Sequence, residues 1–478
     1  MQISRSCDGR GASPLAALAD HLKAGARRLI APAVAAVIAA VAPAQAASPP
    51  EAAKIDWKQQ SGTTIDLFLV KHPWTDGVEP LLPEFEKLTG IKLNVTTVTE
   101  DAYWNKASLG MTAAKPPFDV LFMSMGITGV TAYSNNWIAK LNTFLDDPKL
   151  TDKSWYDYAD FYPAAATAFR MPTPASEGIY GIPMSTEVYM MFYRKDLFEK
   201  AGIDAAAIGT FDEWFAALDK LKLDDGSYRA ALRGGGLGIL DELNAAVADS
   251  WGSAPYEKDR FVYFDANWKP RFDDPRIVKG FDIWASLMKR SAPGVTAFDW
   301  YEATSLFAQG KAATFGPDAS LFASIFIDPK QSTVADKIGF RPVPAASPDG
   351  AHTAMWSWGL SIPEKSAKKE AAWLFVQWAT SPAVTEQIAR KTLAAPRKST
   401  WDSKDFQAAL PPGFGDAVGK SLAIAQPSIM YLQSADKVVE GMLDALHAIY
   451  QGTPAADAAK TLQETATDVV TEAGLYKP

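Results

Sequence analysis

Hydrophobic and polar positions follow two alternating periods from residue 62 onward. Short runs rich in apolar and β-branched residues have the period of strands, and the segments between them place apolar residues at helical spacing. The pattern predicts strands at residues 63–70, 91–98 and 118–123, and helices at residues 78–88 and 102–114. Strands that alternate with helices in this order form a parallel α/β sheet.

Two loops follow strands of this predicted sheet. His72, Pro73 and Trp74 come after the first strand, and Ser124 and Met125 come after the third. Open sheets of this kind bind ligands beyond the carboxyl ends of their strands. We therefore take Trp74, Ser124 and Met125 as candidate ligand-binding residues.

A second group of elements begins after the proline-rich break at residues 171–174. One of its helices starts with a capping box, formed by Thr210 and Glu213. The pattern predicts strands at residues 181–193 and 358–362, a helix-to-strand unit at 306–315, and helices at 196–201, 210–221, 368–380, 434–450 and 455–471. The chain thus enters a second domain near residue 181.

The beginning of the chain has the order of a secretory signal peptide. Arg27 and Arg28 precede an apolar run over residues 29–41, and small residues follow, so that cleavage would fall before Ala47. The apolar run is shorter than the about 20 residues that a membrane-spanning helix needs. Residues 1–46 are therefore predicted to direct export and to be removed.

Composition narrows the possible partners. Without its first 46 residues the chain keeps 42 basic and 53 acidic residues, a net charge of −11, whereas binding to nucleic acid needs a basic surface. The single cysteine, Cys7, lies in the segment to be removed, which leaves no thiol for a disulfide or a metal site. No later stretch is apolar enough to cross a membrane. We expect a folded periplasmic protein that does not bind nucleic acid, and a transport function would need separate membrane subunits.

The sequence contains no clear motif for catalysis, a cofactor or a metal. The histidines after residue 46, His72, His352 and His447, are far apart and lack a partner of the HExxH type. The glycines at 234–236 lack the lysine of a phosphate loop, so a flexible turn explains them better. An acid pair of the glycosidase type could still be assembled by the fold. We predict no catalytic residue, cofactor or metal.

Tryptophans and scattered polar residues are the best signs of a ligand. Flat aromatic rings suit the C–H-rich faces of sugars and polyols, although a tryptophan is more often part of a core. Hydroxyl groups also need fixed charged or amide partners. Near predicted loops and strand ends, the aromatic candidates are Trp74, Trp104, Trp356 and Trp358, and the polar candidates are Glu187, Glu242, Asn244, Asp318 and Arg397.

Several segments stand in an order that covers nearly all of the chain after the signal. They are FEKLTGIKLNV (85–95), PFDVLFM (117–123), GIPMSTEVYMMFYRKDLFEKAGI (181–203), TFDEW (210–214), FAQGKAATFGPDAS (307–320), WSWGLSIPEKSAKKEAAWLFVQWATS (356–381) and APRKS (395–399). In these segments the chain resembles the extracellular solute-binding proteins of ABC importers, in the group that binds sugars and polyols.

The resemblance implies a two-lobed α/β fold, that of a type II periplasmic binding protein, with a ligand cleft between lobes joined by hinge crossings. It places crossings near Tyr180, Trp358 and Pro411. The expected division is a signal peptide (1–46), a flexible lead-in without strong periodicity (47–61), a first lobe (62–180 and 359–411) and a second lobe (181–358 and 412–478).

The resemblance also implies roles for single residues. Glu187 matches the hinge position where an acidic side chain meets ligand hydroxyls, and Trp358 matches an aromatic that stacks on the ligand, with Trp356 beside it. The loops that match ligand-binding loops contain Ser124, Met125 and Arg397. Asp318 departs from the pattern, because many sugar binders have an aromatic there, and this departure favours a small polyol or monosaccharide.

We therefore predict a monomeric receptor that captures a sugar or sugar alcohol and delivers it to the membrane permease of an ABC importer. Two alternatives remain open, a secreted carbohydrate-active hydrolase and a binding protein for another solute such as a polyamine, an oligopeptide or a metal complex. Replacing Trp358 or Glu187 by alanine should weaken binding at least about tenfold. We expect the same changes to have little effect on the melting temperature of the free protein.

Overall fold

The computed structural model describes residues 47–224, 226–346 and 350–477. The signal peptide predicted for residues 1–46, with Cys7, lies outside the described residues. The main sheet has the strand order β2-β1-β3-β10-β6-β8-β7, with β11 beside β10 and β9 beside β6, and β4 and β5 form a separate hairpin. The strands are β1 (Thr64–Val70), β2 (Lys92–Val98), β3 (Val120–Met123), β4 (Arg170–Met171), β5 (Gly178–Ile179), β6 (Ile182–Arg194), β7 (Tyr228–Ala231), β8 (Ala312–Ala319), β9 (Ile338–Arg341), β10 (Thr353–Ser361) and β11 (Ala425–Pro427).

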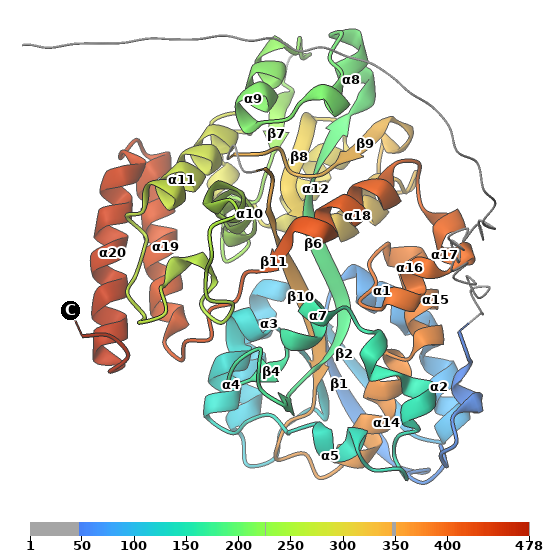
Figure 1. Ribbon diagram of the computed structural model, residues 1–478. Coiled ribbons are helices and arrows are strands. Elements are labelled where there is room, and N and C mark those ends of the chain that lie inside the picture. Colours follow the sequence, from blue (N-terminus) through green and yellow to red (C-terminus); the bar gives the residue numbers. More distant parts are fainter. Residues whose placement is uncertain (1–46, 225, 347–349, 478) are drawn as a thin grey trace, which may run out of the picture. The chain divides into compact units, whose positions relative to one another are not determined.

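Helices surround this sheet (Figure 1). They are α1 (Pro73–Val78), α2 (Leu82–Thr89), α3 (Glu100–Thr112), α4 (Val130–Ser134), α5 (Asn142–Leu145), α6 (Lys153–Tyr156), α7 (Pro163–Thr167), α8 (Lys195–Lys200), α9 (Phe211–Lys220) and α10 (Ile239–Trp251). They continue with α11 (Pro275–Met288), α12 (Trp300–Ala308), α13 (Ala323–Phe326), α14 (Lys369–Ala379), α15 (Pro382–Thr392), α16 (Lys398–Asp402), α17 (Lys404–Ala409), α18 (Phe414–Ile424), α19 (Ala435–Tyr450) and α20 (Ala455–Glu472). Within the described residues, no helix combines the length and apolar character that a bilayer span requires.

Two long strands in the middle of the sheet join its two halves. β6 and β10 lie side by side and antiparallel, with Ser185 opposite Trp358 and Glu187 opposite Trp356 (Figure 1). Beyond this stretch β6 pairs with β8 and β9, whereas β10 pairs with β3 on its other side. The middle of β6 therefore lies where the two halves of the sheet meet.

Each half of the sheet has its own hydrophobic core. In the first half β1 is parallel to β2 and β3, as the pattern predicted, and its core continues into α14. In the second half one core is formed mainly by α10, α11, α19 and α20, and another lies between β6, β8, α12, α13 and α18. The first core also contains the apolar side chains of β1 and β3. In the helices, apolar residues at helical spacing bury one face of each helix.

Most predicted elements are present, and the capping box of Thr210 and Glu213 at the start of α9 is confirmed. The predicted helix 78–88 differs, because the structure has α1, a 3-10 turn (Glu79–Leu81) and α2 in its place. Pro80 and Pro83 lie inside this stretch and remove the backbone donors that one continuous helix would need.

One expected segment lies differently from the prediction. Residues 47–61 were expected to be flexible, but Trp57 is buried there and its ring packs edge-on against Trp155, with centroids 5.6 Å apart. A buried tryptophan contributes a large apolar area, which explains why this segment lies against the first core.

Near Pro411, where a crossing was expected, the chain passes from α17, whose Phe406 packs with Ala389 of α15, to α18, whose Phe414 ring packs against Phe340 of β9. Farther on, β11 lies beside β10, with Ala425 opposite Thr353.

Candidate ligand-binding site

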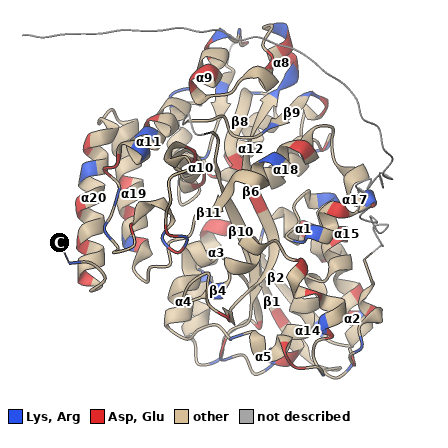
Figure 2. Cartoon of the chain, in the orientation of Figure 1, with Lys and Arg blue, Asp and Glu red and all other residues tan. Residues whose placement is uncertain are grey.

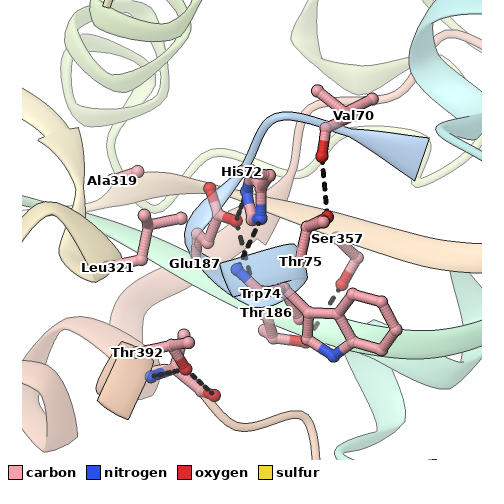
Figure 3. A network of polar contacts seen from close by, with 12 residues as sticks. Val70, His72, Trp74, Thr75, Thr186, Glu187, Ala319, Leu321, Ser357 and Thr392 are labelled. Carbon is pink, nitrogen blue, oxygen red and sulfur yellow. Dashed lines mark hydrogen bonds and ion pairs between the residues drawn. The ribbon is translucent and has the colours of Figure 1, made fainter. Parts of the chain in front are cut away.

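A buried histidine–carboxylate pair lies at the centre of the sheet (Figure 3). Glu187 is in the middle of β6 and is 4% exposed, and His72 follows β1 as the N-cap residue of α1. The imidazole Nδ1 accepts a hydrogen bond from the backbone N–H of Trp74 (3.1 Å), so Nε2 carries the proton. This Nε2 lies 3.4 Å from Glu187 Oε1, and the Ser185 hydroxyl donates to the same oxygen (3.2 Å). The protein thus holds the Glu187 carboxylate from two sides.

Aromatic rings form a wall beside this pair. The Trp358 ring, on β10, stacks on the Trp104 ring of α3 with centroids 5.6 Å apart and an angle of 12° between the planes. It also meets the rings of His72 (5.7 Å) and Trp356 (6.1 Å) edge to face. Rings arranged in this way present flat apolar faces next to a charged group. That combination suits ligands with both C–H faces and hydroxyl groups.

Trp356 lies over a short π-helical turn, Met125–Gly129, which follows β3. A Cβ atom at Gly126 would come within 2.7 Å of the Trp356 ring, so the absence of a side chain there permits the close approach. The Nε1 of Trp356 is buried and has no hydrogen-bond partner among the described residues. Together with Ser124 and Ser357, Trp356 lines a small pocket.

A cluster of three carboxylates surrounds one arginine in the second half of the sheet. Arg233, which follows β7, binds Asp318 at the end of β8 through Nε (2.9 Å) and also through Nη2. Its Nη1 lies 2.5 Å from Asp241 Oδ2, and its backbone N–H donates to Glu242 Oε1 (2.8 Å). The Tyr189 hydroxyl, on β6, donates to Asp241. Tyr189 stands two positions after Glu187 on the same strand, and side chains two positions apart share one face of a sheet.

The crowding of these carboxylates changes their protonation. Burial raises the pKa of Asp241 to about 7, against the lowering effect of the Arg233 charge. Burial and the Asp318 charge raise the pKa of Glu242 well above its ordinary value. Burial alone would lower the pKa of Arg233, but the three carboxylates hold it above its ordinary value. The arginine therefore stays charged, while the carboxylates compete for it.

A pH experiment tests the state of Asp241. Because its pKa rises from 3.8 to about 7 on folding, the folded protein binds this proton more tightly than the unfolded chain does. The resulting stability is complete below pH 4 and is lost as the pH rises through about 7, by on the order of 1.4 kcal/mol for each pKa unit. In Asp241→Asn, the free energy of unfolding should fall less steeply between pH 5 and pH 8 than in the unmodified protein, as chemical denaturation would measure.

Asp219→Asn provides the control for this experiment. The Asp219 side chain is 56% exposed, and its pKa is lowered by a hydrogen bond from Arg290. The Asp219→Asn change should therefore leave the fall in the free energy of unfolding between pH 5 and pH 8 as steep as in the unmodified protein. An Asp241→Asn slope equal to that of the unmodified protein would contradict a raised Asp241 pKa.

Contacts between the two halves complete the site. The Tyr301 hydroxyl, on α12, donates to the Lys71 carbonyl oxygen just before His72 (3.0 Å). The Tyr301 ring stacks on Trp300, and the Trp300 ring stacks on Phe322, which lies 5.6 Å from the Arg233 guanidinium. An unbroken series of contacts therefore runs from the arginine cluster to the loop that holds His72.

The structure brings most of the predicted site residues together. One contiguous set contains His72 and four predicted residues, Glu187, Trp104, Trp356 and Trp358. Two further predicted residues, Glu242 and Asp318, bind Arg233. Three others lie on the elements that carry this set. They are Trp74, whose ring packs against Phe122, Ser124, which lines the small pocket with Trp356, and Met125, which is buried at the start of the π-helical turn.

The structure does not bring Asn244 and Arg397 to this set. Asn244 accepts a hydrogen bond from the Tyr263 hydroxyl (2.6 Å) in the second core. Arg397 is fully buried, donates to backbone carbonyls of Tyr156, Asp157 and Thr380, and lies over the Phe161 ring at 3.9 Å. All of its nitrogen donors are used inside the first half, which is a structural function.

Sequence reasoning missed Arg233, Asp241 and Tyr189, although it included two partners of the arginine, Glu242 and Asp318. Arg233 precedes the three glycines that were interpreted as a flexible turn, and Tyr189 and Asp241 were not considered. An arginine directly after a strand and before a glycine-rich segment was the available signal. His72 was noted as a loop residue without a partner of the HExxH type, and the structure places it against Glu187. Within the described residues, no group of three or more His, Cys, Asp and Glu could hold a metal ion.

Comparisons with known proteins point to one family. Residues 72–386 match the family model of the bacterial extracellular solute-binding proteins, which is more than half of the chain. The erythritol/L-threitol-binding protein of Mycolicibacterium smegmatis is 25% identical over 441 residues, 87% of each chain. The mannitol-binding protein of Pseudomonas aeruginosa is 34% identical over 216 residues, 44% of this chain and 47% of that one.

Solved structures show the same fold. The ABC transporter solute-binding protein of Agrobacterium vitis with bound D-mannitol aligns with a TM-score of 0.71 and 26% identity, over 86% of this chain and 99% of that one. The ABC transporter solute-binding protein of Agrobacterium radiobacter in complex with ribitol has a TM-score of 0.73 and 22% identity, over 86% and 99% of the two chains. The two-lobed α/β fold predicted from the sequence is confirmed.

Proposed function

The chain belongs to the bacterial extracellular solute-binding protein family, and we propose that it captures a small linear polyol, or a sugar of similar size, for an ABC importer. The observation that carries this proposal is the buried Glu187 carboxylate beside the stacked rings of Trp358 and Trp104. Relatives named for erythritol, L-threitol and mannitol, together with a D-mannitol complex at 26% identity, support the same class of ligand.

The proposed ligand would lie where the two halves of the sheet meet. Its C–H groups would pack on the rings of Trp358 and Trp104, and its hydroxyl groups would bond to Glu187 and to the Arg233–Asp318 pair. A hydrogen bond to a charged group contributes about 1.5–3 kcal/mol. Hydroxyl groups suit these partners because each can donate to a carboxylate and accept from a guanidinium.

Binding by both halves explains how capture would be linked to delivery. His72 and Trp104 come from the first half, whereas Arg233 and Asp318 come from the second. A ligand that bonds to both sets favours the closed arrangement, because a ligand shifts an equilibrium toward the state that it binds better. We propose that the closed, monomeric protein in the periplasm then docks on the membrane permease of the importer and catalyses no reaction.

A thermal-shift screen of the chain from residue 47 to residue 478 tests the proposal. The panel contains erythritol, ribitol, mannitol and glucitol, with monosaccharides, oligosaccharides, amino acids and polyamines for comparison. A ligand at 100 times its Kd adds about 2.7 kcal/mol to the free energy of unfolding, so a polyol that binds should raise the melting temperature clearly. Calorimetric titration then gives the Kd.

The other results of this screen have different meanings. A shift with polyamines alone would replace the polyol by another solute. Consumption of a glycoside, followed by chromatography of the mixture, would favour the hydrolase alternative. If no polyol or sugar shifts the melting temperature or gives heat in the titration, the proposed ligand class is wrong.

A further inference from the structure

Charge sets a limit on the ligands that this site accepts. We infer that the site discriminates by charge. It rejects a polyol in which a terminal CH₂OH is oxidised to a carboxylate. It accepts a polyol in which the terminal hydroxyl is replaced by an ammonium group. The inference rests on the proposed polyol site and concerns the ends of the ligand chain.

The first observation is the excess of carboxylates. Glu187 lies beside His72, and Asp241, Glu242 and Asp318 surround Arg233. Figure 2 shows the acidic position in the middle of β6. Glu100, at the start of α3, adds another carboxyl close to this set, because the Arg233 and Glu187 charges both act on it and burial raises its pKa.

The second observation is that the available cation is already used. Arg233 binds Asp318 through Nε and Nη2 and binds Asp241 through Nη1. The other base of the site, His72, already has a partner at each ring nitrogen, because Nδ1 accepts from the Trp74 backbone N–H and Nε2 lies 3.4 Å from Glu187 Oε1. Lys71 lies at the edge, where its Nζ is 5.8 Å from the Tyr301 ring. An incoming carboxylate would have to share Arg233 with Asp241 and Asp318, which already bind it.

The third observation concerns the carboxylate beside the aromatic wall. His72 Nε2 and the Ser185 hydroxyl both lie against Oε1 of Glu187. Oε2 of Glu187 is therefore the acceptor that a ligand can use. A hydroxyl or an ammonium group can donate a hydrogen to such a site, whereas a carboxylate is an acceptor only. Like charges a few ångströms apart at low dielectric repel strongly, which adds to the same preference.

A matched series of ligands tests the inference. D-Mannitol has two equivalent ends, so D-mannonate and 1-amino-1-deoxy-D-mannitol each change one end unambiguously. In calorimetric titrations at pH 7.5, we expect mannonate to bind at least about 100-fold more weakly than mannitol, and the amine to bind within about tenfold of mannitol or more tightly. Erythritol and erythronate repeat the comparison on a four-carbon chain.

A charge variant separates repulsion from poor fit. Glu187→Gln keeps the shape of the side chain and removes one negative charge, so the ratio of mannitol to mannonate affinity should fall at least threefold even though both affinities change. Mannonate binding within threefold of mannitol would overturn the inference and leave the proposed function standing, as would an unchanged ratio in Glu187→Gln. If neither mannitol nor erythritol binds, the polyol that the thermal-shift panel identifies and its carboxylate and amine forms take their place in the series. If no polyol or sugar binds, the proposed function fails and this inference fails with it.

Discussion

Replacing Arg233 by methionine is expected to lower the free energy of unfolding by about 3–5 kcal/mol. The arginine is 7% exposed and is the cation that Asp241, Glu242 and Asp318 share. Removing it would leave these carboxylates buried beside one another, and breaking a buried ion pair costs more than the pair contributes. Chemical denaturation at pH 8 measures the effect.

The pH dependence of this variant gives a second readout. At pH 5 Asp241 and Glu242, whose pKa values are raised, hold their protons. A neutral carboxyl gains less from the charge of the arginine than a carboxylate does. The loss of stability in Arg233→Met should therefore be smaller at pH 5 than at pH 8. Adding Asp318→Asn to Arg233→Met should restore part of the stability at pH 8, because one uncompensated charge is removed.

Lys420→Met provides a matched control for the loss of a paired cation. The Lys420 side chain is 64% exposed and pairs with Asp416 on the surface of α18. Exposed pairs contribute about 0–1 kcal/mol, so this change should be nearly silent. An Arg233→Met protein as stable at pH 8 as the Lys420→Met protein would show that the carboxylate cluster does not depend on Arg233.

Much of the fold could be predicted because local patterns and the final structure agree. The strand at 182–194 is an apolar run bounded by turn residues. Helix α9 begins at the capping box that the sequence predicts. The structure differs from the prediction where a single residue type has a larger effect than the periodicity of apolar residues. Pro80 and Pro83 interrupt the segment that was predicted to be one helix. Trp57 is buried in the segment that was predicted to be flexible.

The candidate site could be predicted only in part, because it is assembled from distant segments. Glu187 and Trp358 were found from a resemblance that covers their own strands. Arg233 and Asp241 lie close to Asp318 only after the chain has folded, and a single sequence gives no measure of such distances. Arg397 fitted the pattern of a ligand-binding loop, yet nothing in its local sequence revealed that backbone carbonyls would occupy its donors.

Replacing Glu187 by glutamine is expected to weaken polyol binding by at least about tenfold, which corresponds to about 1.4 kcal/mol. The amide keeps the shape of the carboxylate but loses its charge, and hydrogen bonds to charged groups are about twice as strong as neutral ones. Glu386→Gln is the matched control, because Glu386 is also buried but binds Arg390 and Ser403 instead. Equal polyol affinity in the two variants would remove Glu187 from the site.

Replacing Trp358 by alanine is expected to weaken binding by at least about tenfold and also to lower the free energy of unfolding by about 3–5 kcal/mol. The second effect differs from the expectation based on sequence, because Trp358 is 5% exposed and its ring packs on Trp104. Trp104→Ala separates the two effects, since that ring is less deeply buried and still stacks on Trp358. It should lose affinity in calorimetric titration with a smaller loss of stability. If both variants bind polyol as tightly as the unmodified protein, the aromatic wall is part of the core alone.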